Sequence, residues 1–306
     1  MNLVIGSRGS KLALWQSEWV RARLAELEPS ASTRIEVIRT MGDARRDVPL
    51  STIGGQGAFT KELEVALLEG RIDIAVHSLK DLPTVVPEGL RIAATPARED
   101  ARDALVLRAG ADGADASIGN LPAGAVVGTS SLRRIAQLRH LRPDVAVKDL
   151  RGNVDTRLRK LDGGEYDALI LASAGLRRLG FAGRISAAID AREMLPAVGQ
   201  GALGVETRAD AAETNALVSR LDHRETRAAV VAERALLRHL GGGCQVPIAA
   251  HARVEGEALR LTGLVASLSG DALIRDAMEG AAGDAERLGH TLAARLLERG
   301  AASLLQ

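Results

Sequence analysis

Cysteine, aromatic side chains and net charge are all scarce in this chain of 306 residues. The single cysteine excludes an internal disulfide and a metal site built from several cysteines. Aromatic residues make up only 2%, so aliphatic side chains must fill the cores. Forty Lys and Arg residues against 39 Asp and Glu leave no global field that would attract nucleic acid or a membrane surface. Since the chain has no apolar run of about 18 residues and no export signal, we expect a cytoplasmic protein without membrane or nucleic-acid partners.

Short β-type runs alternate with amphipathic helical stretches through the first two-thirds of the chain, which is typical of βαβ units and a largely parallel sheet. Trp15 and Trp19, four residues apart on the first helix, are expected to pack in the core. The predicted strands are 3–5, 34–40, 72–77, 104–108, 125–129, 145–150 and 168–172, and the predicted helices are 11–27, 60–69, 132–141, 154–161, 224–240 and 285–299.

The pattern changes near residue 221. A long helix is followed by alternating runs with tight turns and then by a final amphipathic helix, which predicts a small antiparallel α+β domain. The segment "LPAVGQGALGVE" (195–206) reads as a loop running into a strand that could return to the first sheet. The chain length is consistent with two or three domains.

Three junctions between a strand and a helix combine glycine, Ser, Thr or Asn, and arginine: "IGSRGSK" (5–11), "VGTSSLRR" (127–134) and "LRGNVDTR" (150–157). Unpaired N–H groups at a helix start favour anions, and arginine suits forked contacts with carboxylate or phosphate. The alternative is that Ser10, Ser130 or Ser131, and Asn153 are ordinary N-caps beside solvated arginines. Three such junctions together favour a ligand with several acidic groups.

Two further stretches carry candidate residues. "AVHSLKDLP" (75–83) brings His77, Ser78, Lys80 and Asp81 to the end of an apolar strand. Asp81 before Leu-Pro is either a turn residue or a catalyst, and His77 as a general base is the weaker hypothesis. In "GGQGAFTKELE" (54–64), Phe59 either enters the core at a helix start or belongs to a lid that covers a planar ligand.

The only cysteine, Cys244, stands in "HLGGGCQVPI" (239–248). Free cysteine is usually buried, but three preceding glycines cannot fill a core and let a bulky group approach the backbone. A cysteine nucleophile would need a neighbouring base, and metal binding by one thiol is weaker still, so no metal is expected.

Taken together, the motifs "SRGSKLALWQ", "HSLKDLP", "VGTSSLRR", "LRGNVDTR", "LPAVGQGA" and "GGGCQVPI" resemble porphobilinogen deaminase, the hydroxymethylbilane synthase family, in the family's order from residue 7 to 248. The resemblance implies two α/β domains like type II periplasmic binding proteins, with the active cleft between them, plus a small α+β third domain. It implies domain 1 at 1–98 with 199–220, domain 2 at 99–198 and domain 3 at 221–306. Segments near 98–102 and 199–201 are candidate hinges.

The resemblance also implies the activity: four porphobilinogen molecules are condensed head to tail with release of ammonia and hydrolysed to hydroxymethylbilane, in tetrapyrrole and haem-type biosynthesis. The primer is a dipyrromethane cofactor held by a thioether, which by motif position falls on Cys244, while Asp81 matches the catalytic aspartate. Cofactor contacts are implied for Lys80, Ser78, Thr129, Ser130, Ser131, Arg133, Arg134, Arg151 and Gly152, and substrate contacts for Arg8, Ser10, Phe59, Arg157, Arg178 and Gln200.

The glycine loop departs from the family, because Gln56 and Thr52 stand where many members carry basic residues. That departure puts a carboxylate contact from this loop in doubt. The expected protein is a monomer whose partner is the small molecule porphobilinogen. The rival hypotheses are a non-catalytic two-lobed anion-binding protein, which leaves Cys244 and Asp81 without a purpose, and a nucleic-acid-binding protein, which the charge balance opposes.

Overall fold

The computed structural model describes residues 1–41, 59–110, 115–242 and 246–305. Its contacts group the chain into two compact units, 1–99 with 202–227 and 100–201 with 228–306. The helices are α1 (Lys11–Leu27), α3 (Lys61–Leu68), α4 (Leu132–Leu141), α5 (Val154–Asp162), α6 (Ser173–Arg178), α7 (Ala212–Ser219), α8 (Arg224–His239) and α9 (Ala285–Glu298), with 3-10 turns η1 (Leu79–Asp81), η2 (Ala182–Arg184), η3 (Ala282–Asp284) and η4 (Ala301–Leu304).

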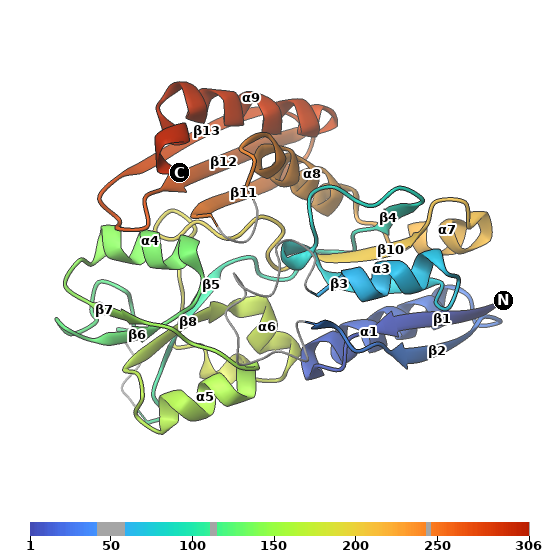
Figure 1. Cartoon of the computed structure of the whole chain (residues 1–306), viewed down its shortest axis with the longest axis horizontal. Coiled ribbons are helices and arrows are strands. Elements are labelled where there is room, and N and C mark those ends of the chain that lie inside the picture. Colours follow the sequence, from blue (N-terminus) through green and yellow to red (C-terminus); the bar gives the residue numbers. More distant parts are fainter. Residues whose placement is uncertain (42–58, 111–114, 243–245, 306) are drawn as a thin grey trace. The chain divides into compact units, whose positions relative to one another are not determined.

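The first unit is built on a five-stranded sheet in the order β2-β1-β3-β10-β4 (Figure 1). Its strands are β1 (Asn2–Ser7), β2 (Ser32–Val37), β3 (Ile74–Ser78), β4 (Leu90–Ala94) and β10 (Leu203–Arg208). The pairs β1–β2 and β1–β3 are parallel, but β10 is antiparallel to both of its neighbours. The expected return of the 195–206 segment to this sheet is confirmed by β10, and the expectation of a largely parallel sheet is confirmed for the other four strands, since only β10 runs in the opposite direction.

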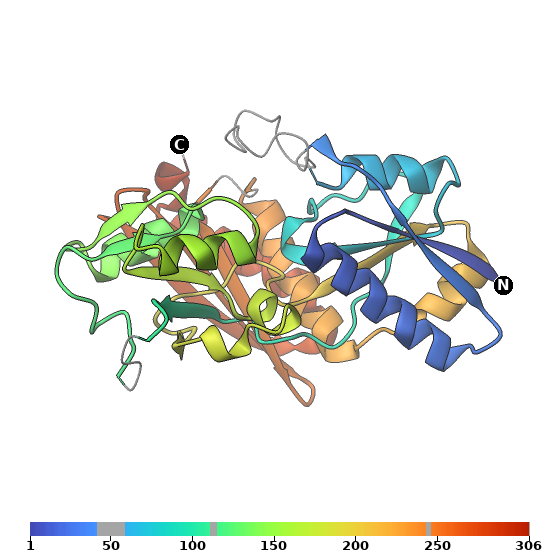
Figure 2. The same ribbon diagram turned by 90° about the horizontal axis from the view of Figure 1, so that it is seen from below.

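Helices α1 and α3 cover opposite faces of this sheet (Figure 2). Because strand side chains alternate, Leu3 and Ile5 face α1, whereas Val4 faces α3. Trp19 packs against the α1 side of the core, as expected, but Trp15 is exposed and its predicted burial is wrong. The α1 boundaries match the prediction, since the Ser10 side chain caps the helix start.

The second unit contains another mixed sheet, in the order β7-β6-β8-β5-β9. Its strands are β5 (Asp103–Leu107), β6 (Val126–Gly128), β7 (Ala146–Lys148), β8 (Ala168–Ala172) and β9 (Ala187–Ala188). Strand β6 is parallel to β7 and β8, while β5 is antiparallel to β8 and β9. Helix α4 packs on one face through Leu138, and α5 packs on the other through Leu158 and Leu161.

The same unit also holds an antiparallel sheet of β11 (Ile248–Glu255), β12 (Ala258–Ala266) and β13 (Leu273–Ala281), covered by α8 and α9 (Figure 1). This sheet packs against α4: Ala136 of the helix joins a cluster with Leu264 and Ala266, and Arg139 donates to the carbonyl of Leu268 at 2.7 Å. The expected fold class, two α/β sheets plus a small α+β part, is confirmed. The division into three domains stays a prediction.

Candidate functional site

The predicted residues of the first unit gather where β3 ends. Strand β3 is buried as far as His77, Ser78 is half-buried, and the 3-10 turn η1 then carries Lys80 and Asp81. Leu79, almost fully buried, fixes this turn because its N–H donates to the carbonyl of Ala202 at 3.0 Å. An apolar anchor between two polar residues therefore holds Asp81 at the carboxyl end of the strand.

Asp81 lies in a small cavity of about 50 Å³. The Asp81 side chain is half-buried, and its carboxylate takes part in no hydrogen bond or ion pair among the described residues. A fixed carboxylate without a partner is suited to stabilise positive charge on a ligand. The polar and aromatic residues that line the cavity are Arg8, Ser10, Gln16, Phe59, Thr60, His77, Ser78 and Asp81.

Arg8 and Phe59 meet at this cavity. The guanidinium carbon of Arg8 lies 4.1 Å from the centroid of the Phe59 ring, which is a cation–π contact. Phe59 is half-buried against Arg8 and belongs to none of the core clusters among the described residues. Ser10 accepts a hydrogen bond from the N–H of Ala13 at 3.2 Å, so its interpretation as an N-cap is confirmed.

In the second unit, Arg133 and Arg134 both turn towards one buried carboxylate. Arg133 reaches Asp103 at 2.6 and 3.0 Å, and Arg134 reaches it at 2.8 and 3.1 Å. Gln200 completes the network, because its amide N–H donates to Asp103 at 2.8 Å and its carbonyl oxygen accepts from Arg133 at 3.1 Å. All four side chains are buried, so the alternative of solvated arginines is wrong for Arg133 and Arg134.

The charges of this network, which we call the Asp103 cluster (Asp103, Arg133, Arg134 and Gln200), do not balance. Burial alone would raise the pKa of Asp103, but the two guanidinium groups hold that pKa well below its usual range. Burial lowers the pKa of Arg134, yet a guanidinium remains charged in proteins. The cluster thus holds two cations and one anion, and the Nε of Arg133 is buried without a partner among the described residues.

The other predicted residues of this unit lie where β6 and β7 end. The Ser130 hydroxyl donates to the carbonyl of Leu150 at 2.6 Å and accepts from its N–H at 3.0 Å, which ties two of the predicted junctions together. Arg151 pairs with Asp149 at 2.6 Å, and Arg157 donates to the carbonyl of Gly152 at 2.7 Å. Ser131 and Asn153 occupy the N-cap positions of α4 and α5, as the alternative interpretation predicts, but neither side chain makes a capping hydrogen bond.

Further predicted residues differ in their exposure. Thr129 is buried beside this junction, and Gly152 adopts a φ of 106°, which glycine tolerates. Arg178 is buried at the end of α6 and donates to the carbonyl of Gly201 at 2.6 Å. Cys244, Gln56 and Thr52 lie outside the described residues.

Sequence reasoning missed Asp103 and Glu206, the buried acids that hold Arg133, Arg134 and His77. Each acid carried a signal, because each stands in a run of apolar strand residues, "DALVL" and "LGVETR". A carboxylate in a buried strand requires a cationic or hydrogen-bonding partner.

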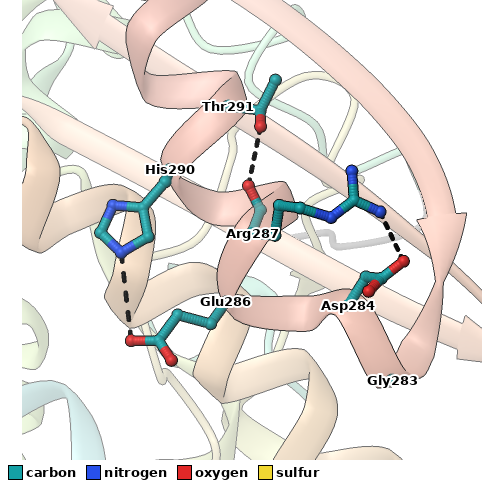
Figure 3. Close-up of a pocket in the computed structure, with 6 residues that line it drawn as sticks. All are labelled: Gly283, Asp284, Glu286, Arg287, His290 and Thr291. Carbon is teal, nitrogen blue, oxygen red and sulfur yellow. Dashed lines mark hydrogen bonds and ion pairs between the residues drawn. The ribbon is translucent and has the colours of Figure 1, made fainter.

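A second hollow lies at the start of α9 and is lined by exposed or half-buried polar side chains, including Glu286 and His290 (Figure 3). It contains none of the predicted site residues. Among the described residues, no helix is long and apolar enough to cross a membrane.

Two family models match the chain: porphobilinogen deaminase, dipyromethane cofactor binding domain, over residues 3–216, and the porphobilinogen deaminase C-terminal domain over 227–298. Porphobilinogen deaminase of Pelobacter propionicus is 50% identical over 99% of this chain and 96% of its own length. That of Pelotomaculum thermopropionicum is 53% identical, again over 99% and 96%. Among solved structures, the Lactococcus lactis GlnP substrate binding domain 2 is 13% identical over 78% of this chain and 90% of that chain, with a TM-score of 0.44.

Proposed function

The chain belongs to the porphobilinogen deaminase family, and we propose that Asp81 is its catalytic carboxylate and that Cys244 carries its dipyrromethane cofactor. The protein is a transferase that condenses porphobilinogen with release of ammonia and yields hydroxymethylbilane. When bound, the cofactor supplies the primer to which porphobilinogen units are joined.

The main support for the proposal is that the Asp81 carboxylate has no partner among the described residues and can interact with a ligand. Loss of ammonia leaves positive charge on the pyrrole of porphobilinogen, and a preorganised carboxylate stabilises that charge without reorganising. Asp81 fits because it lines a cavity, is half-buried, and has no hydrogen bond or ion pair among the described residues. Lys80 adjoins it in η1 and brings a positive charge to the same turn.

The residues of the second unit fit a cofactor that bears several carboxylates. The Asp103 cluster has one cation in excess, and the orphaned Nε of Arg133 points to an acceptor that Asp103 does not supply. Arg151 is about one-third exposed and adds a guanidinium nearer the surface. The proposed cofactor ligands are Cys244, Ser78, Lys80, Thr129, Ser130, Ser131, Arg133, Arg134, Arg151 and Gly152.

Substrate contacts are proposed at Arg8, Ser10, Phe59, Arg157, Arg178 and Gln200. Arg8 has the strongest support, because its stacking on Phe59 orients the guanidinium at the cavity that holds Asp81. Gln200 has the weakest support, because its amide is engaged inside the Asp103 cluster and its side chain is almost fully buried. A ligand contact by Gln200 requires this cluster to open.

A cytoplasmic, monomeric enzyme that takes no nucleic-acid partner completes the proposal. It is supported by the near-zero net charge and the single cysteine.

The test is an intact mass of the purified protein combined with an aldehyde colour reaction for pyrroles. We expect an added mass equal to one dipyrromethane, a positive colour reaction, and loss of both in Cys244→Ser. Because the chain has a single cysteine, a thioether maps to one position. A bare mass without colour, not restored by incubation with porphobilinogen, would refute the cofactor assignment.

A further inference from the structure

A buried histidine next to Asp81 has no role in the proposed function. His77 Nε2 lies 3.0 Å from Oε2 of Glu206, and both side chains are almost fully buried. The two residues come from neighbouring antiparallel strands, in which His77 is opposite Gly204 and Glu206 is opposite Ala75. Since side chains two residues apart share a face, His77 and Glu206 lie on the same side of the sheet.

That side is the one covered by α3. Ala75 packs in the α3 cluster, which places the imidazole and Glu206 towards Glu64 of the helix. Burial raises the pKa of Glu64, and the charge of Glu206 raises it further. Among the described residues, Glu64 and Glu206 on the α3 side and Asp81 and Arg8 at the cavity are charged groups near the imidazole.

The pair is arranged as a base with its orienting carboxylate. His77 lines the same cavity as Asp81, and its Nδ1 has no hydrogen-bond partner in the part of the chain that the structure describes. With Nε2–H donated to Glu206, the lone pair of the neutral ring is on Nδ1. The cavity of about 50 Å³ accommodates a molecule the size of water or ammonia. Glu206 is buried with its other oxygen, Oε1, unpartnered among the described residues, so the imidazole is its main counterpart.

We propose that His77, oriented by Glu206, is the base that accepts the pyrrole N–H proton of porphobilinogen, relayed by a water molecule in this cavity, as ammonia leaves. The inference rests on the proposed function. The N–H bond of the pyrrole breaks and its electron pair forms the ring C=N bond. The ring electrons shift to form the exocyclic C=C bond, and the bond to the ammonium group breaks with its pair leaving on ammonia. Nδ1 then passes the proton to the released ammonia, which departs as ammonium and leaves the imidazole neutral.

In this proposal, Asp81 and His77 have different roles in the same reaction. Asp81 stabilises positive charge on the pyrrole ring, whereas His77 removes the ring proton and thereby makes the ring neutral. The buried carboxylate holds the ring in one tautomer and stabilises the imidazolium once it forms, as the third member of a catalytic triad does.

His77→Gln in the cofactor-loaded enzyme tests the inference, because Gln keeps a donor for Glu206 and lacks a base. We expect kcat to fall about 10²–10⁴-fold, the usual contribution of a positioned base, with KM changed less than about threefold. The pH dependence of kcat should also change, because the group that removes the proton is absent. His290→Asn, in the hollow at the start of α9 (Figure 3), is the matched control and should leave rate and profile unchanged.

A His77→Gln enzyme with full kcat and an unchanged pH–rate profile would overturn the inference. If that variant fails to fold, Glu206→Gln is the second test. We expect its kcat to be at least about tenfold lower, because the imidazole loses the carboxylate that orients it. An unchanged kcat would refute the role of this pair. The intact mass and ammonia release of the wild type are measured first. Their absence refutes the proposed function, whereas their presence with an unaffected His77→Gln refutes only the role of His77.

Discussion

The Asp103 cluster allows a quantitative test, since Asp103→Asn removes one charge and almost no volume. Asp103 is fully buried and accepts from two guanidiniums and from Gln200. Removing one partner of a buried ion pair costs about 3–5 kcal/mol, because the remaining charge is left uncompensated. Here two cations are left without a counter-charge, so we expect a loss of free energy of unfolding at the upper end of that range.

Urea unfolding followed by circular dichroism measures this loss. With a slope of about 2 kcal/mol per molar, the midpoint should fall by about 2–2.5 M. Hydrogen exchange should increase first in β5 and at the start of α4, because these elements carry Asp103 and its arginines. The control is Glu286→Gln, an exposed residue 3.5 Å from Arg238, which should change the free energy of unfolding by less than about 0.5 kcal/mol.

The pH dependence gives an independent check. Because the folded-state pKa of Asp103 is depressed, its stabilisation is present above the unfolded value of about 4 and is lost as pH falls through the folded value. The gap between wild type and Asp103→Asn should therefore stay constant from pH 8 to about pH 5 and close only in stronger acid. A loss below about 1 kcal/mol at pH 7, or a gap that closes near neutrality, would refute the account of a buried, ionised cluster.

Three other positions give predictions of their own. Asp81→Asn should retain the dipyrromethane mass but lose about 10²–10³-fold in kcat, and near-normal turnover would exclude the electrostatic role. Arg151→Leu should slow cofactor assembly, because it removes a half-buried guanidinium, and intact mass should show a lower fraction of cofactor-loaded protein. Arg192→Leu, which breaks an exposed ion pair with Asp190, is the control and should leave that fraction unchanged. Gly289→Ala should cost about 1–3 kcal/mol, since its Cβ would lie 2.4 Å from the carbonyl oxygen of Ala232 on α8; Gly283→Ala meets nothing within 4 Å and should be neutral.

Local chemistry made the elements of this fold predictable. The boundaries of α1, α4 and β8 match the expected 11–27, 132–141 and 168–172, because hydrophobic periodicity and the residues at each start and end are properties of adjacent positions. The direction of β5 and β10 was not predictable in the same way. An antiparallel strand inserted between parallel ones depends on a distant crossover, which leaves no periodic signal in the strand itself.

The candidate site shows the same limit. The motifs predicted that Arg133, Arg134 and His77 matter, but Asp103 lies 30 residues before Arg133, and Glu206 lies 129 residues after His77. A sequence shows that a strand carries a charged residue, whereas only the fold shows which cation satisfies it.

Taken separately, the two units carry candidate groups of opposite charge. In the first unit, the acidic residue at the cavity is Asp81, which has no partner among the described residues, and behind it lies the buried pair of His77 and Glu206. In the second, guanidiniums exceed carboxylates in the Asp103 cluster. A substrate that becomes cationic at its ring while carrying carboxylates on its substituents suits groups of both signs, which is why Asp81 and the arginines are proposed for different contacts. Asp103 offsets the charge of only one of its two arginines, so among the described residues one guanidinium of the cluster is left without a matching carboxylate.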